Sequence, residues 1–343
     1  MSAKPKTPLT EVEDIPVVKV AYQTYSEEAP KSSLRVSSGL MVTSLKAFTV
    51  AALMLAYPTL VVANHDIDDT TINLADAPRH WTATEAGVAA TLISRELDGP
   101  GWVADRHRWH PQSRLKALPA WQSSLVEAVA DHGRLSLSLF EGQKDPDLDA
   151  AIRLLGRSGT EAEAAVPRLV AAREALTRYD GRVGAGLAGR PTGADVLAAE
   201  LDLTAKWAGA SRAILGNLAS PGDGWMASTE AVQAVYQAKA RAHVAHEVLS
   251  ARLETEENSY PSTEAELAAL QALEKWRVAA KLRPLFVSNH GADAVIGANH
   301  PAMMAFLISD AAEASKRAAE LLRKSPEPTG DQASELATQV PAP

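Results

Sequence analysis

The sequence contains no cysteine, few aromatic residues and no concentration of positive charge. Without cysteine the chain forms no disulfide, binds no metal through thiolates and has no thiol for catalysis. Aromatic residues make up 5% of the chain, and no long stretch alternates apolar and polar residues, so a β-sheet is not expected. The formal net charge of −8 argues against nucleic acid as the main partner, because phosphate binding needs a concentrated basic surface.

One uncharged apolar run near the N-terminus predicts a membrane anchor. Residues 47–63 carry no charge, and the mostly apolar residues 36–45 precede them, with Lys46 between. A hydrocarbon core about 30 Å thick needs roughly 17 to 25 helical residues, and a Lys at one end can reach the headgroups. We therefore expect a single transmembrane helix within 36–63, with 47–63 as its core. A buried core helix and a cleaved signal sequence are the alternatives.

The charges that flank this run predict its orientation. The basic residues before it are Lys31, Arg35 and Lys46, and the acidic residues after it are Asp66, Asp68 and Asp69. Because basic flanks are retained in the cytoplasm, the N-terminal tail should lie inside and the main domain outside. In a Gram-negative cell the main domain would then be periplasmic, and the chain would be a single-pass protein of the inner membrane.

The rest of the chain predicts an all-α fold, with an antiparallel multi-helix bundle following the anchor. Residues 1–34 and 325–343 have little periodic hydrophobicity and are expected to be disordered tails, the first one cytoplasmic. Residues 64–324 form the helical periplasmic domain, since amphipathic helices with short breaks pack into bundles. We expect one domain, and two lobes at about 78–157 and 160–324 are the alternative. The predicted helices cover about 82–97, 118–140, 145–155, 160–184, 193–218, 229–256, 263–282 and 301–323.

Several segments of the chain, taken in order, carry a family resemblance. They are YPTLVVANHDIDD (57–69), ATLISREL followed by GPGWV (90–103), LP with WQ (118–122), DPDLDAAIRLL (145–155), ALTRYDGRVGAG (175–186) and RPLFVSNHGAD with ANHPA (283–302). Together they resemble DUF2333, a family of bacterial membrane proteins of unknown function. The resemblance covers about residues 50–324. It implies an inner-membrane anchor and a helical periplasmic domain, and it implies no activity.

Two positions depart from the pattern of that family. Ala104-Asp105-Arg106-His107 stands where the family usually has Pro-Asn-Asp-Pro, and Asn289-His290-Gly291 stands where it has Asn-Gly. A function shared through those loops would be altered in this chain.

Two loops hold the candidate binding residues. The His, Asp and Asn side chains of SNHGADAVIGANH could ligate a cation or transfer a proton. Alternatively, Asn299 could simply cap the last helix. In DRHRWHPQSR, alternating Arg, His and Trp109 could bind anionic lipid headgroups or a polymer, or form a solvated turn. The candidates are Asn289, His290, Asp293, Asn299 and His300 in the first loop and Asp105, His107 and His110 in the second.

Two further clusters are interpreted as structural. His243, His246 and Glu247 share one helix face in HVAHE, but the order differs from the His-Glu-x-x-His of zinc hydrolases, so we expect a polar face. His65 with Asp66, Asp68 and Asp69 could bind a cation, and we expect it instead to be an acidic cluster that sets membrane topology. The sequence identifies no bound metal.

These patterns favour a non-enzymatic envelope protein that binds a partner protein or an envelope component. No Gly-rich phosphate loop, nucleophile elbow or Ser/His/Asp arrangement is found, and no cofactor is predicted. The alternative is an envelope hydrolase or metal-binding protein that uses the loop of His290, Asp293 and His300. Membrane lipid is the expected partner of the anchor, and self-association through small anchor residues is a further hypothesis. Those small residues are Ala51, Ala52 and Ala56.

Overall fold

The computed structural model describes most of the predicted helical domain. The described residues are 46–52, 67–77, 79–103, 106–107, 109–140, 142, 144–156, 165–219, 227–255, 260–284, 286–290 and 298–324. The two predicted tails, 1–34 and 325–343, lie outside them. Met1–Leu53 and Met54–Pro343 are separate compact units, and each is described by itself.

Only residues 46–52 of the first unit are described, and they are helical and exposed. They are also the only described part of the predicted anchor 36–63. Among the described residues, no helix is both long enough and apolar enough to cross a membrane. The anchor therefore stays a prediction that depends mainly on residues the structure does not describe.

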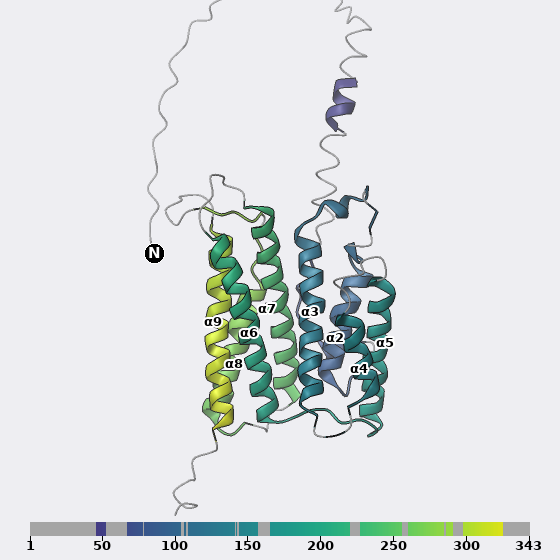
Figure 1. The fold of residues 1–343 in the computed structure, drawn as a ribbon, viewed down its shortest axis with the longest axis vertical. Coiled ribbons are helices and arrows are strands. Elements are labelled where there is room, and N and C mark those ends of the chain that lie inside the picture. Colours follow the sequence, from purple (N-terminus) through teal and green to yellow (C-terminus); the bar gives the residue numbers. More distant parts are fainter. Residues whose placement is uncertain are drawn as a thin grey trace, which may run out of the picture. The chain divides into compact units, whose positions relative to one another are not determined.

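The regular secondary structure among the described residues of the second unit is helical, which confirms the all-α prediction (Figure 1). Its one strand-like pairing in the described part is a single bridge between Asn289 and Asn299. The helices are α2 (Thr84–Asp98), α3 (Ala117–Ser138), α4 (Pro146–Gly156), α5 (Ala165–Gly184), α6 (Ala194–Leu218), α7 (Thr229–Thr255), α8 (Thr263–Ala280) and α9 (His300–Arg323), with short 3-10 turns η1 (Leu74–Asp76) and η3 (Pro111–Arg114).

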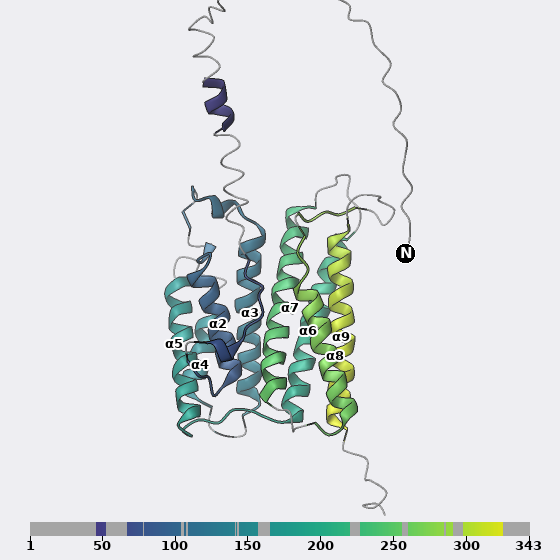
Figure 2. The same cartoon turned by 180° about the vertical axis from the view of Figure 1, so that it is seen from behind.

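Consecutive helices run antiparallel and form two neighbouring groups, α2–α5 and α6–α9 (Figures 1 and 2). The groups meet mainly where α7 packs against α3, and α2 also contacts α7. Helix α5 packs on α2 and α4, so the alternative lobe boundary near residue 160 would divide the first group.

Helix α7 lies at the junction because nearly every face of it can be buried. Ala occurs at 231, 234, 238, 240, 242, 245 and 251, all buried, and small side chains let neighbouring helices approach from several directions. The same helix buries charged side chains, whose partners are described below.

The helix ends follow their capping signals. Ser262 accepts a hydrogen bond from Ala265 N at 3.2 Å and caps α8, and Asn299 accepts one from Ala302 N at 2.9 Å and caps α9. Asp145 accepts from Asp147 N at 2.9 Å, with Pro146 in the first turn of α4. Each of these side-chain oxygens satisfies N–H groups at a helix start that would otherwise be unpaired.

The start of α2 differs, because no side chain near it in sequence caps it. The residue at the cap position is Ala83, which supplies no side-chain hydrogen bond. Asp180 of α5 acts in its place, since its Oδ1 accepts from Thr82 N at 2.7 Å and from Ala83 N at 2.8 Å. Arg79 Nη2 holds the second oxygen of Asp180 at 2.6 Å. A residue about a hundred positions away thus closes the helix, and no local pattern can reveal it.

Candidate functional site

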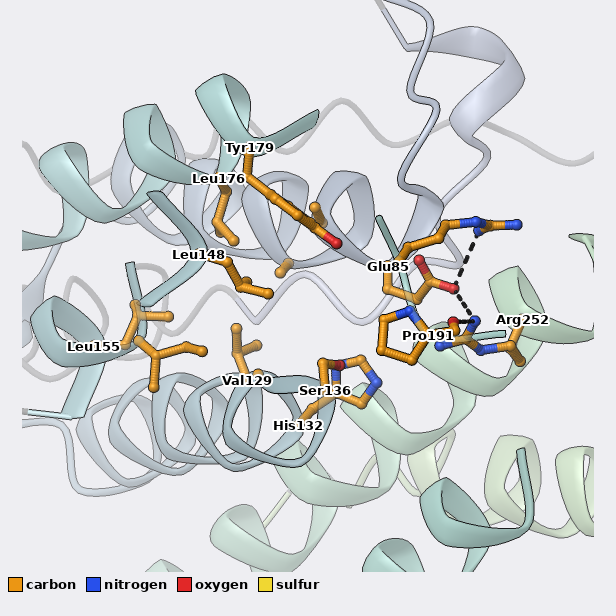
Figure 3. A pocket seen from close by; sticks show the side chains of 15 residues that line it. Glu85, Val129, His132, Ser136, Leu148, Leu155, Leu176, Tyr179, Pro191 and Arg252 are labelled. Carbon is orange, nitrogen blue, oxygen red and sulfur yellow. Dashed lines mark hydrogen bonds and ion pairs between the residues drawn. The ribbon is translucent and has the colours of Figure 1, made fainter. Parts of the chain in front are cut away.

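A narrow cavity lies among the helices of the α2–α5 group, and Figure 3 shows its lining. Its empty volume is about 480 Å³, part of which is open to solvent. The aliphatic lining residues are Ala86, Ala89, Val129, Leu148, Ile152, Leu155 and Leu176.

Helical spacing explains why one end of the cavity is apolar. Leu148, Ile152 and Leu155 follow one another at intervals of four and three residues on α4, so they share one face. Gly133 lets α4 approach α3 closely, since a Cβ at that position would lie 2.7 Å from Ile152 Cγ1. The face of α4 therefore closes one side of the cavity.

Charged and polar side chains gather at the other end, where Glu85 and Arg252 are joined by dashed lines in Figure 3. Arg252 Nη1 lies 2.7 Å from Glu85 Oε1 and donates to Pro191 O at 2.9 Å. Arg190 Nη1 reaches the same Glu85 oxygen at 3.4 Å. Helices α2 and α7 and the segment between α5 and α6 thus meet at one carboxylate.

Glu200 of α6 is the second carboxylate held by Arg252. Arg252 Nη2 donates to Glu200 Oε1 at 2.6 Å and Arg252 Nε to Oε2 at 3.1 Å, while His132 Nε2 lies 3.0 Å from Oε1. Burial by itself would raise the pKa of Glu200, but the charge of Arg252 and the bonds from His132 and Arg252 lower it to about 2. Glu200 is therefore ionised and fully engaged.

Ser136 also lines the cavity, one helical turn beyond His132. A serine, a histidine and a glutamate are the residue types of a hydrolytic triad, which requires a hydrogen bond from the nucleophile to the base. The described contacts include the His132–Glu200 bond and no Ser136–His132 bond. The arrangement thus offers a hydroxyl and a histidine bonded to Glu200 to a bound molecule, without an assembled nucleophile.

A second polar cluster lies along α7, facing the segment that follows the predicted anchor. Lys239 Nζ donates to Asp69 Oδ2 at 2.5 Å, and Arg283 also pairs with Asp69. Glu247 Oε2 accepts from Ile72 N at 2.7 Å. Because Asp69, Lys239 and Glu247 are all buried, the segment from Asp69 to Ile72 is fixed to the core of the bundle by charged groups.

Burial changes the protonation of this cluster. It raises the pKa of Glu247 to about 7, against the opposing effects of the Ile72 N–H and Arg95. Burial also lowers the pKa of His243 to about 3 and that of Lys239 to about 8. Desolvation disfavours the charged form in each case. Within the described contacts, His243 Nε2 and Glu247 Oε1 have no hydrogen-bond partner.

The interpretation of HVAHE as a polar face is therefore wrong. His243, His246 and Glu247 are all buried, and His243 stacks on Trp121 of α3 with ring centroids 5.5 Å apart. Periodicity placed the three residues on one face, but that face packs against neighbouring elements. Burial likewise lowers the pKa of His246, to about 4.

One residue of the acidic cluster after the predicted anchor, Asp69, has a role that the sequence did not indicate. Asp69 is a buried ion-pair partner of Lys239, so it has a structural role in the bundle. Asp68 accepts hydrogen bonds from Thr70 N at 3.1 Å and from its hydroxyl. His65 and Asp66 lie outside the described residues.

The described part of the SNHGADAVIGANH loop is tied to the ends of α6 and α9. Asn289 Nδ2 donates to Leu218 O at 3.1 Å, and Asn299 Nδ2 donates to Ala219 O at 2.7 Å. His300 Nδ1 accepts from Ser288 N at 3.1 Å, and burial lowers its pKa. Asn289, Asn299 and His300 thus bond the backbone, as the structural alternative predicted. His290 is partly buried, and Asp293 lies outside the described residues.

The described part of the DRHRWHPQSR loop lies beside different helices from those that the SNHGADAVIGANH loop contacts. His110 Nδ1 accepts from Gln112 N at 3.3 Å and caps η3, and Gln112 in turn bonds Pro100 O. His107 is exposed, with its Nδ1 3.4 Å from Trp109 N, and Asp105 lies outside the described residues. This loop packs beside α2 and α3, whereas the other loop bonds the end of α6, so their described parts share no site.

Sequence reasoning missed the residues that make the cavity polar. Glu85, His132, Glu200 and Arg252 come from four different helices, and no two of them are close enough in sequence to form a motif. A weak signal was available, because each is a charged or polar residue on an apolar helix face. Such residues are rarely buried unless they are paired.

Neither a metal site among the described residues nor a similarity to known proteins assigns a function to the chain. No group of three or more His, Asp or Glu side chains in the described part could hold a metal ion. No family model matches the chain, and neither the curated proteins nor the solved structures include a significant match. The resemblance to DUF2333 stays a prediction.

Proposed function

We propose that this chain is a single-pass protein of the bacterial inner membrane whose periplasmic bundle binds an amphipathic envelope molecule without transforming it. The uncharged run 47–63 and its flanking charges support the anchor and the orientation. The described residues of that run are helical and exposed, as a helix that contacts lipid would be. Membrane lipid is then the partner of the anchor.

The observation that carries the binding role is the cavity, which is aliphatic at one end and charged at the other. A ligand with a slender apolar chain and a polar end would match both ends, because apolar sites bind through burial and a few polar groups fix orientation. A fatty acid or a single acyl chain of a lipid has this chemistry.

Arg190 is the residue best placed to bind an acidic end. Its contacts with Glu85 Oε1 and Thr84 Oγ1 are long, 3.4 and 3.5 Å, and its side chain is 22% exposed. Arg252 by contrast is 1% exposed and donates at 2.6 Å to Glu200. A ligand carboxylate could therefore pair with Arg190 and leave the buried network intact.

The test is photolabelling of the full chain in vesicles with a fatty acid that carries a diazirine on its chain, followed by mapping of the labelled peptides. We expect adducts in the α4 peptide that contains Leu148 and Leu155. Ala89→Leu, which fills the cavity, and Arg190→Gln should each lower that labelling at least about five-fold, equivalent to about 1 kcal/mol. Arg153→Gln is the matched control, since Arg153 is 67% exposed. Equal labelling of all four chains would refute the binding site.

A hydrolase is the second candidate, at a site other than the loop of His290, Asp293 and His300, because the His132–Glu200 pair has Ser136 one turn away in the same cavity. A bound ester that moved Ser136 into contact with His132 would complete the triad. Release of fatty acid from a phospholipid by the full chain, abolished in Ser136→Ala, would support this candidate. Photolabelling without any release would favour the binding role.

The topology has its own test, with reporter fusions before and after the apolar run. A fusion at Ser38 should report the cytoplasm and one after Asp76 the periplasm. A cytoplasmic signal from the second fusion would overturn the orientation. A pull-down from solubilised membranes would identify any protein partner or a second copy of the chain.

A further inference from the structure

The end of the bundle at which Ile67 lies, called here the Ile67 end, is identified by its contacts. Arg95, in the last turn of α2, bonds Thr70 O at 2.5 Å, and Arg283, just beyond the end of α8, pairs with Asp69. The loop containing η3 and the connection from α8 to α9 are at this end, the upper one in Figure 1.

The chain between the predicted anchor and this end is short. Four residue steps separate Ala63, the last residue of the apolar run, from Ile67, and a fully extended chain covers at most about 14 Å in that number of steps. The headgroup layer on one side of a bilayer is itself about 5 to 8 Å thick. If the anchor spans the membrane as proposed, the Ile67 end can stand only a little beyond the headgroups.

The connection is also fixed where it reaches the bundle. Asp69 is buried between Lys239 and Arg283, with Arg283 Nε donating to Asp69 Oδ2 at 2.9 Å. Ile72 N donates to the buried Glu247. The bundle therefore does not hang from a long tether, because its core is bonded to the chain within a few residues of the predicted membrane exit.

The Ile67 end exposes aromatic side chains of the kind that prefer a membrane interface. Trp109 beside η3 is 69% exposed, and Phe286 after α8 is 52% exposed. Trp in particular is enriched at the level of lipid headgroups, and Phe binds the acyl boundary. Both come from connections between helices rather than from the helices themselves.

The charge of the described loops and terminal turns at this end is complementary to anionic lipid. Two exposed acidic residues, Asp98 and Glu230, are outnumbered there by exposed basic ones. Basic residues close to a membrane surface are attracted by anionic headgroups, within about a Debye length. The exposed basic residues are Arg106, Arg114, Lys116 and Lys281, in addition to Arg283, whose charge is paired with Asp69.

We infer that the Ile67 end is a surface that contacts lipid. Trp109 and Phe286 enter the periplasmic leaflet of the inner membrane, and the basic residues around them pair with anionic phospholipid headgroups. The inference rests on the proposed anchor and adds a second contact between the bundle and the bilayer. It also gives the bundle a fixed orientation on the membrane.

The test uses the absence of cysteine from the chain, which makes single-cysteine labelling clean. The full chain with Trp109→Cys or Phe286→Cys carries an environment-sensitive fluorophore in vesicles of about three parts phosphatidylethanolamine to one part phosphatidylglycerol, with nitroxide-bearing lipids as quenchers. Leu187→Cys is the matched control, because Leu187 follows α5 at the opposite end and is 69% exposed, like Trp109.

We expect the labels at 109 and 286 to be quenched at least about two-fold more than the label at 187, and less so in vesicles of phosphatidylcholine alone. Equal quenching at the three positions, in a chain that resists alkaline extraction from the vesicles, would overturn the lipid surface and leave the anchor intact. Release of the chain by alkaline extraction would overturn both. A disulfide between two copies of the Trp109→Cys chain, without lipid quenching, would assign this surface to a second copy and overturn the inference.

Discussion

Replacing Glu247 by Gln should change how the stability of the bundle depends on pH. Glu247 is buried, with its side chain 1% exposed, and its pKa rises from a usual value of 4.5 to about 7. The folded chain therefore binds a proton at this carboxyl that the unfolded chain releases near pH 4.5. Gln stays neutral at every pH and keeps an oxygen that can accept from Ile72 N.

The sign and the size of the effect follow from linkage. Between about pH 4.5 and 7 the folded state binds more protons at Glu247, so this residue makes stability fall as pH rises. Each unit of pKa difference corresponds to about 1.4 kcal/mol, and the total penalty above pH 7 is about 3 kcal/mol. Between pH 5 and pH 8 the Glu247→Gln variant should therefore gain about 2 to 3 kcal/mol relative to the natural chain.

The neighbouring histidines have the opposite sign. The pKa of His243 is lowered to about 3 and that of His246 to about 4, so the unfolded state binds more protons below about pH 6.5 and stability rises with pH there. Both histidines are present in the natural chain and in the variant. The difference between the two pH profiles therefore isolates Glu247, and above pH 6.5 its effect should dominate.

The assay is urea unfolding of the full chain in one detergent, followed by far-ultraviolet circular dichroism from pH 5 to pH 8. The control is Glu320→Gln, since Glu320 is an exposed residue of α9, and its profile should follow that of the natural chain. If the Glu247→Gln profile also ran parallel to the natural one, Glu247 would be ionised in the folded state. The buried-acid reasoning would then be refuted.

Three further substitutions test the packing around the cavity by thermal unfolding. Arg252→Leu should cost about 3 to 5 kcal/mol because it leaves buried carboxylates without their cation, whereas Arg153→Leu, at a residue 67% exposed, should cost under about 1 kcal/mol. Gly133→Ala should destabilise the bundle by about 1 to 3 kcal/mol, because the added Cβ would lie 2.7 Å from Ile152 Cγ1. Adding Ile152→Val to this variant should not restore the lost stability, because valine keeps a carbon at the Cγ1 position. Trp121→Phe removes the 2.7 Å bond from Nε1 to a buried carboxylate and should cost about 1 to 3 kcal/mol.

The helices of this bundle were largely predictable because their signals are local. The stop at Pro261 and the cap at Ser262 delimit α8, and Asn299 with Pro301 starts α9. An apolar stripe, a capping oxygen and a Pro act within a few residues of one another. The loop asparagines were predictable for the same reason, since Asn299 caps its own helix.

The polar interior was not predictable, because its partners are distant in sequence. Asp180 closes α2 from α5, and Arg252 of α7 reaches both Glu85 and Glu200. Helical periodicity gives the face on which a charged residue lies, but not the element that covers that face. HVAHE was interpreted as a polar face for this reason, although its residues are buried.

The same physics explains why the charges of α7 can be buried at all. A buried ion costs several kcal/mol unless hydrogen bonds and an opposite charge compensate, and loss of one partner leaves the other uncompensated. Lys239 is compensated by Asp69, which belongs to the segment between the predicted anchor and the bundle. The bundle core and that segment are therefore mutually dependent: α7 needs Asp69 to neutralise Lys239, and the segment needs α7 for its position.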